Sequence, residues 1–75
     1  NAFRCYPNPA KDILVVETQG ASLLTPTEYR ITNLMGQNLL QGHINDTIQH
    51  IHIESLPAGI YIITLGTATQ KLVVR

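Results

Sequence analysis

Short runs in which apolar and polar residues alternate, separated by Gly and Pro, make up most of the chain. Successive side chains of a β-strand point to opposite faces, so this period of two predicts strands with one buried face. The segment Gln70–Arg75 shows the pattern most clearly. Its predicted core positions are Leu72 and Val74, and its predicted solvent-facing positions are Lys71, Val73 and Arg75. Both cations of this segment are therefore expected on one exposed face.

Other segments of the chain also read as short strands. Ile60–Leu65 is an apolar run broken only by Thr64, and we expect a strand that is largely buried on both faces. The remaining predicted strands are 2–6, 13–17, 28–34, 38–41 and 47–53, and an eighth at 22–24 is too short to assign firmly. A spacing of roughly 8–12 residues between strands is typical of an antiparallel sandwich or barrel.

Gly and Pro mark the predicted turns. Pro7-Asn8-Pro9 is expected to form a turn or an extended corner, because the residue before a proline avoids helical geometry. Gly36, in the turn 33–37, is expected to use the positive φ that glycine allows, and Gly59, in the turn Leu56–Gly59, can take positive φ without steric cost. Further turns or loops are predicted at 18–21, 42–46 and 66–69.

Length and charge limit the kinds of function that the chain can have. Its 75 residues predict one domain, 1–75, with a thin core, because a chain of this size buries only about 60% of its unfolded surface. Five basic and five acidic residues give a net charge of zero, which argues against a nucleic-acid groove and a polybasic membrane anchor. Strand-like sequence begins at once, so we expect a C-terminal piece of a longer protein whose targeting segment lies upstream.

Candidate chemistry is sparse. His50 and His52 share one face of a predicted strand, with His43 placed to approach across a hairpin, and such imidazoles can ligate zinc or copper. We favour the simpler interpretation, in which both alternate with isoleucines on a solvated face, and we predict no metal, no cofactor and no enzymatic activity. The tyrosines and the phenylalanine are interpreted as core residues, and Cys5 as a small, partly buried apolar residue.

Three boxes of sequence, in order and spanning nearly the whole chain, resemble the type A C-terminal sorting domain of the type IX secretion system of Bacteroidota. An opening box ends in the Pro-Asn-Pro corner, a middle box forms a predicted hairpin, and a third box has the pattern L-P-x-G-x-Y before a basic terminal strand. The boxes are Tyr6–Pro9 with Ile13–Val16, Tyr29–Gln37, and Leu56–Tyr61 with Lys71–Arg75. One departure is Arg75, where the family more often ends in Lys.

The resemblance implies a fold and a function. The fold would be an all-β, immunoglobulin-like antiparallel β-sandwich of about seven strands. The domain would direct an upstream cargo, in the same polypeptide, from the periplasm through the type IX translocon and its shuttle components to the cell surface or the medium. A sortase-like cysteine protease would then remove the domain, and the cargo would be attached to surface lipopolysaccharide.

Specific residues follow from these boxes as hypotheses. Recognition by the translocon is assigned to Pro57, Gly59, Tyr61, Lys71, Val73 and Arg75, and structural turns to Pro7, Asn8, Pro9 and Gly36. Exposed strand edges in so small a domain also predict a strand-swapped dimer at high concentration. The alternative function is a structural or carbohydrate-binding β-sandwich accessory module, although tryptophan, which carbohydrate modules usually expose, is absent.

Overall fold

The computed structural model of the protein describes residues 3–18 and 27–75, which form seven strands and no helix. The strands are β1 (Phe3–Tyr6), β2 (Ile13–Thr18), β3 (Thr27–Asn33), β4 (Asn38–Ile44), β5 (Ile48–His52), β6 (Gly59–Leu65) and β7 (Ala68–Val74). The short strand predicted at 22–24 and most of the turn at 18–21 lie outside the described residues. In the described part of the chain, no helix is long and apolar enough to cross a membrane.

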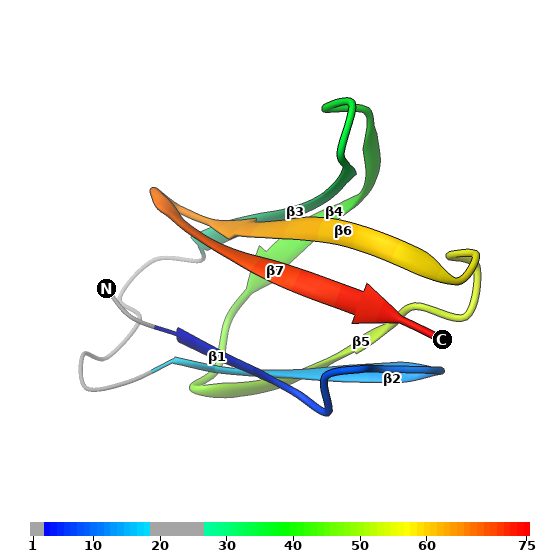
Figure 1. Cartoon of the computed structure of the whole chain (residues 1–75). Helices are drawn as coiled ribbons and strands as arrows, with labels where there is room; N and C mark the ends of the chain where they lie inside the picture. The colour runs from blue at the N-terminus through cyan, green and yellow to red at the C-terminus, as the bar shows by residue number, and fades with distance from the viewer. Residues whose placement is uncertain (1–2, 19–26) are drawn as a thin grey trace.

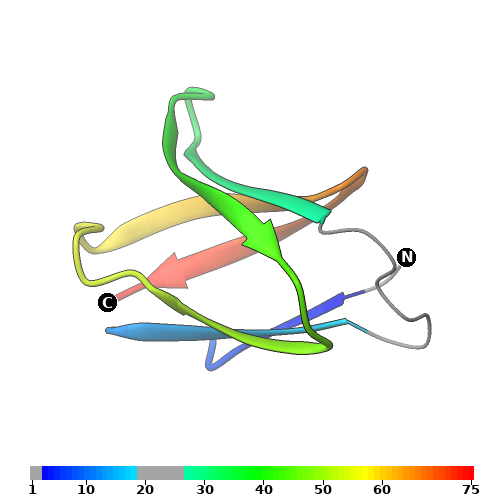
Figure 2. The same ribbon diagram turned by 180° about the vertical axis from the view of Figure 1, so that it is seen from behind.

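The strands form two antiparallel sheets that lie one above the other (Figures 1 and 2). The first sheet has the order β1-β2-β5 and the second has the order β4-β3-β6-β7. A constant-type immunoglobulin domain pairs its fourth strand with the fifth, whereas here β4 pairs with β3. The prediction of a small, all-β antiparallel sandwich of about seven strands is confirmed, and the pairing of β4 distinguishes it from the constant-type immunoglobulin arrangement.

The core lies between the two sheets and is built from alternate residues of the strands. Leu72 and Val74 are 0% and 2% exposed, so the predicted facing of the terminal strand is confirmed. Tyr61 and Ile63 face inward from the neighbouring strand, and Phe3 closes the core from β1. The other fully buried side chains of the core are Leu14, Val16, Ile31, Ile44 and Ile53. Each inward position is separated from the next by one outward position, as the period of two requires.

Strand β6 departs from the sequence prediction of a strand buried on both faces. Tyr61 and Ile63 are buried, whereas Ile60 is 43% exposed and Ile62 is only partly buried. The described residues place no third layer over the outer side of this sheet, so the apolar residues between the core positions remain in contact with solvent. Strand β6 is therefore buried on one face only, although its continuous apolar run predicts burial on both.

The segment 42–46, predicted to be a loop, partly belongs to a strand. Strand β4 continues to Ile44, and its Gly42 pairs with Tyr29 of β3. The Tyr29 ring lies over the position where a side chain of residue 42 would be, since a Cβ there would be 2.8 Å from the Tyr29 Cε2 atom. An aromatic neighbour that covers a strand glycine in this way replaces the missing side-chain contacts, which explains why glycine is tolerated in the strand.

Candidate recognition face and the strap over its edge

The outer side of the β6–β7 hairpin carries a row of apolar residues that are open to solvent. Ile60 lies opposite Val73, and Ile62 lies opposite Lys71. Val73 and Ile62 are partly exposed, as is Ile60. We call the surface formed by Ile60, Ile62, Lys71, Val73 and Arg75 the β6–β7 face. Sequence reasoning missed Ile60 and Ile62, and the signal that would have found them is their alternation with the buried Tyr61 and Ile63.

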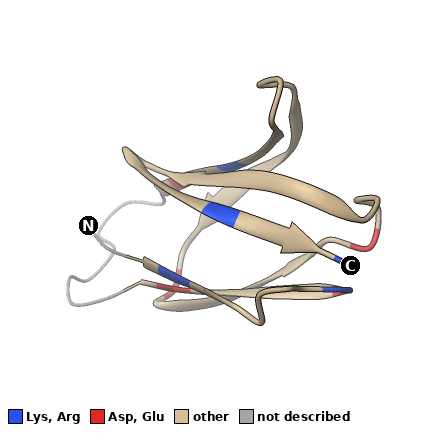
Figure 3. Ribbon diagram, viewed as in Figure 1, with Lys and Arg blue, Asp and Glu red and all other residues tan. Residues whose placement is uncertain are grey.

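Two cations border the apolar row of this face. Lys71 lies in the middle of β7 and Arg75 follows its last residue, and Figure 3 shows basic segments in blue along this strand and at its end. Both residues are exposed. The ion pairs formed among the described residues join Arg4 to Glu17, Arg30 to Glu28 and His52 to Glu54. Lys71 and Arg75 take part in none of these pairs, so their charges are available to an acidic partner. An apolar centre with a charged rim is the usual composition of a protein–protein interface.

The turn before β6 lies at the same end of the molecule as Arg75. Gly59 is the first residue of β6 and pairs with Val74, and the exposed Pro57 precedes it by two positions. Tyr61 does not belong to the exposed face, because only 6% of it is exposed and its hydroxyl donates a hydrogen bond of 2.5 Å to the Pro57 carbonyl. Tyr61 therefore holds the shape of the turn from inside.

Gly59 does not use the positive φ that glycine would allow there. Among the described glycines, only Gly36 (φ 88°) and Gly66 (φ 61°) have positive φ. A Cβ built on Gly59 would be 3.7 Å from the Tyr61 Cε1 atom, which is ordinary van der Waals contact. Gly36 does have the geometry that the sequence predicted. Gly66 occupies the first position of the two-residue turn between β6 and β7, where a type II′ turn requires positive φ.

The opening box lies against the edge of β7 and covers part of it. Peptide bonds Tyr6–Pro7 and Asn8–Pro9 are cis, and the chain between β1 and β2 passes beside the last residues of β7. The buried Ala10 forms an isolated parallel bridge with Val74, in which the Ala10 N–H donates to the Val73 carbonyl and the Arg75 N–H donates to the Ala10 carbonyl, both at 2.8 Å. We call residues 7–10 the strap.

The side chain of Asn8 extends this cover by two residues. Its Oδ1 accepts the Val73 N–H at 3.0 Å, and its Nδ2 donates to the Lys71 carbonyl at 3.2 Å. One amide side chain thus satisfies two backbone groups that point away from β6, as a neighbouring strand would. An edge covered in this way is a poor template for a further strand.

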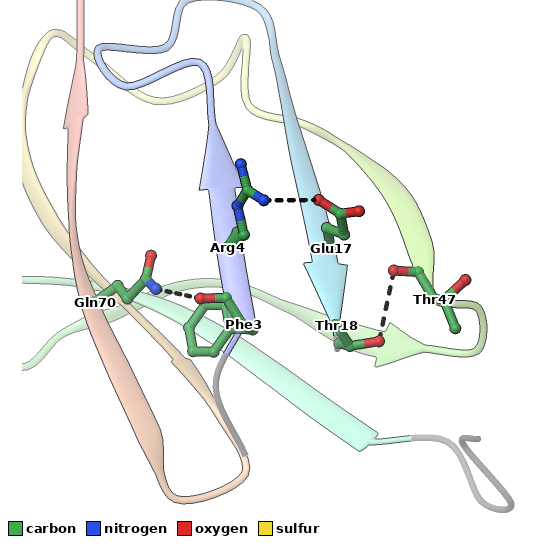
Figure 4. A network of polar contacts seen from close by, with 6 residues as sticks. All are labelled: Phe3, Arg4, Glu17, Thr18, Thr47 and Gln70. Carbon is green, nitrogen blue, oxygen red and sulfur yellow. Dashed lines mark hydrogen bonds and ion pairs between the residues drawn. The ribbon is translucent and has the colours of Figure 1, made fainter. Parts of the chain in front are cut away.

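A second contact joins β7 to the first sheet nearer its start. The side-chain amide of Gln70 donates a hydrogen bond to the carbonyl of Phe3 in β1 (Figure 4). Beside it, Arg4 of β1 and Glu17 of β2 form an ion pair of 4.0 Å, and the Thr18 hydroxyl donates to the Thr47 carbonyl at 3.5 Å. Strand β7 is therefore attached to the opening part of the chain at Gln70 and at the strap.

The remaining chemical candidates are dispersed. His50 and His52 are exposed on β5, while His43 belongs to β4 of the other sheet. Within residues 3–18 and 27–75, no three His, Cys, Asp or Glu side chains are grouped so as to hold a metal ion. Cys5 is half-buried beside the core, and this burial raises the pKa of its thiol to about 11. The thiol is therefore protonated, and poorly nucleophilic, at neutral pH.

A known protein family matches nearly the whole chain. The family described as "Secretion system C-terminal sorting domain" matches residues 4–75. The chain belongs to this family of type IX secretion sorting domains. The family match thus covers the strap, the middle hairpin and the β6–β7 face together. A type IX sorting domain belongs to a family of sorting signals and not to a class of enzymes, and it directs secretion across the outer membrane to the cell surface or the medium.

Among solved structures, the fold is similar to part of a thermostable endoglucanase, a single mutant, from Alicyclobacillus acidocaldarius. The TM-score is 0.56 with 16% sequence identity, over 84% of this chain and 12% of that chain. At this identity the likeness shows the sandwich fold alone. The comparison with curated proteins found no significant match.

Proposed function

We propose that this sorting domain directs an upstream cargo, carried in the same polypeptide, from the periplasm through the type IX translocon, and that the translocon or a shuttle component recognises the β6–β7 face. The observation that supports the proposal is the row of Ile60, Ile62 and Val73 on the outer side of the hairpin, bordered by Lys71 and Arg75. Residues Pro57 and Gly59 extend the surface into the turn at the same end. The buried Tyr61 contributes by fixing that turn.

Processing at the surface completes the proposal. After export, a sortase-like cysteine protease cleaves the chain on the cargo side of the domain, and the cargo is attached to surface lipopolysaccharide. The support for these steps is family membership together with a compact fold that begins at β1, so that a cut before Phe3 would leave the sandwich intact. Cleavage within the strap, by contrast, would expose the edge of β7.

The test is a fusion of residues 1–75 behind a periplasmic reporter in a type IX-competent cell. We expect the reporter on the cell surface, and we expect it to remain in the periplasm in a strain that lacks the translocon. The control is the same reporter without residues 1–75. An intact, folded fusion that stays in the periplasm of the competent strain would contradict the proposed function.

A further inference from the structure

The hairpin formed by β3 and β4 stands away from the rest of the sandwich (Figures 1 and 2). Its tip carries exposed aliphatic side chains. Leu34 is 66% exposed and Met35 is 92% exposed. Leu39, on the β4 side of the same hairpin, is 36% exposed. Single exposed apolar residues are common on proteins, but two adjacent ones at a projecting tip form a small contiguous apolar surface that a concave partner could enclose.

The tip is held in one conformation by Asn33. Its Oδ1 accepts hydrogen bonds from the backbone N–H groups of Met35 at 3.0 Å and Gln37 at 2.9 Å, and its Nδ2 donates to the Gln37 side chain at 3.1 Å. The Gly36 N–H donates to the Asn33 carbonyl at 3.0 Å, in the positive-φ geometry that glycine allows. A tip that is already ordered loses little conformational entropy when a partner binds it.

Charge is absent from this part of the chain. Residues 31–42 contain no ionisable side chain, and Arg30 and His43 are the first on either side. In Figure 3 the projecting end of the hairpin is tan, with neither a blue nor a red segment. An uncharged aliphatic tip is complementary to an uncharged aliphatic pocket, since burying it there leaves no charge unpaired.

The backbone edge of β4 is a poorer binding site for a partner than the side chains at the tip. The pairing of β3 with β4 shifts register between Ile31 and Thr32, and such irregularities interrupt the regular row of edge groups. Further along the edge, the side chain of Gln49 donates to the His43 carbonyl and accepts the Asn45 N–H, both at 3.1 Å. The side chains at the tip therefore offer a partner more than the strand edge does.

We propose that Leu34 and Met35 insert into an uncharged, aliphatic-lined pocket on a protein of the export machinery, at a contact separate from the β6–β7 face. This inference rests on the proposed function. A membrane is a poorer occupant, because residues 31–42 offer none of the Lys, Arg, Trp or Tyr that anchor proteins at a bilayer surface.

The experiment compares three variants in the reporter fusion. The first combines Leu34→Ser with Met35→Ser, which removes the aliphatic groups but keeps every hydrogen bond of the turn, since Met35 contributes only its backbone N–H. The matched control is Ile48→Ser, which removes an aliphatic side chain that is 52% exposed on β5 of the other sheet. We expect the double variant to melt near the wild type while its surface yield falls on the order of tenfold, as hot-spot residues do. The control should export normally, and so should the swap Leu34→Met with Met35→Leu, which keeps the tip aliphatic.

Each other outcome has a definite meaning. Normal export of the folded double variant, beside an exporting wild type, would overturn this inference alone. A wild-type fusion that stays in the periplasm would overturn the proposed function, and this inference with it. If the isolated wild-type chain co-floats with phosphatidylethanolamine–phosphatidylglycerol vesicles and the double variant does not, the tip binds a membrane instead. A wild-type dimer in sedimentation velocity that the double variant abolishes would identify a second copy as the occupant.

Discussion

The side chain of Asn8 occupies the place of a neighbouring strand beside Val73. Its Oδ1 lies 3.0 Å from the Val73 nitrogen, although 65 positions of sequence separate the two residues. The same side chain donates to the Lys71 carbonyl. The opening box and the terminal strand, which are far apart in the sequence, therefore act as one structural unit.

Replacing Asn8 should loosen this unit without unfolding the domain. Asn8→Ala removes two hydrogen bonds at an exposed site, so we expect the free energy of unfolding to fall by about 1–2 kcal/mol. The amide of Val73 should exchange with solvent faster, which hydrogen exchange measured by NMR would show. Asn45→Ala is the control, because the Asn45 contact within the described residues uses its backbone N–H and not its side chain. Equal exchange at Val73 in Asn8→Ala and wild type would show that the strap does not protect the edge.

The terminal strand allows folding and recognition to be separated. Replacing Lys71 and Arg75 together by Ala should cost about 0–1 kcal/mol of stability, because both side chains are exposed. We expect this double variant to melt near the wild type and to reduce surface yield of the fused reporter. Leu72→Ala should instead cost about 2–5 kcal/mol, since Leu72 is 0% exposed, and should abolish export by unfolding the domain. Normal export of the folded double variant would remove the two cations from the recognition site.

Two glycines of similar appearance in the sequence should respond oppositely to alanine. Gly36 has φ 88°, so Gly36→Ala should destabilise the domain by about 1–2 kcal/mol through backbone strain. Gly59→Ala meets only ordinary contacts and should leave stability unchanged or raise it by up to about 1 kcal/mol. Urea midpoints of the two variants provide the measurement. A larger loss in Gly59→Ala than in Gly36→Ala would contradict the backbone geometry of the two turns.

Burial of Cys5 predicts a pH dependence at the alkaline end. Its thiol has a pKa raised from 9.0 to about 11 because burial disfavours the thiolate. A folded state that holds the group neutral is favoured below pH 9 and loses that advantage as pH rises toward 11, so stability should fall across this range. The thermal midpoint of Cys5→Ala should fall less over the same range, with the remainder partly due to Tyr29, whose pKa burial also raises. Identical slopes would show that Cys5 does not titrate differently on unfolding.

Local pattern predicted most of the fold because each strand has an inner and an outer face. The alternation in 70–75 placed Leu72 inside and Lys71 outside, and both assignments are confirmed. In 60–65 the outward positions are also apolar, so the sequence alone does not distinguish the exposed Ile60 from its buried neighbours. Hydrophobicity alone does not show which side of a sheet lacks a covering layer, and that depends on the packing of the whole domain.

The contacts of the strap with β7 cannot be predicted from local sequence, for a different reason. Pro-Asn-Pro predicts a corner, but nothing nearby in sequence says that the Asn8 side chain faces the carbonyl of Lys71 and the N–H of Val73. Those contacts depend on how one sheet is placed on the other. Gly59 illustrates the same limit, since glycine permits positive φ without requiring it, and pairing with Val74 gave it ordinary strand geometry.

Because a ribosome makes a protein from its N-terminus, Asn8 emerges long before the backbone groups that it binds at residues 71 and 73. Until those residues follow and β7 pairs with β6, the strap has nothing to hold, and the outer surface of the hairpin does not exist. A truncated or unfolded domain therefore lacks this surface as well as the fold. If a receptor reads this surface, it accepts only a domain that is complete through β7, and no separate inspection step is needed.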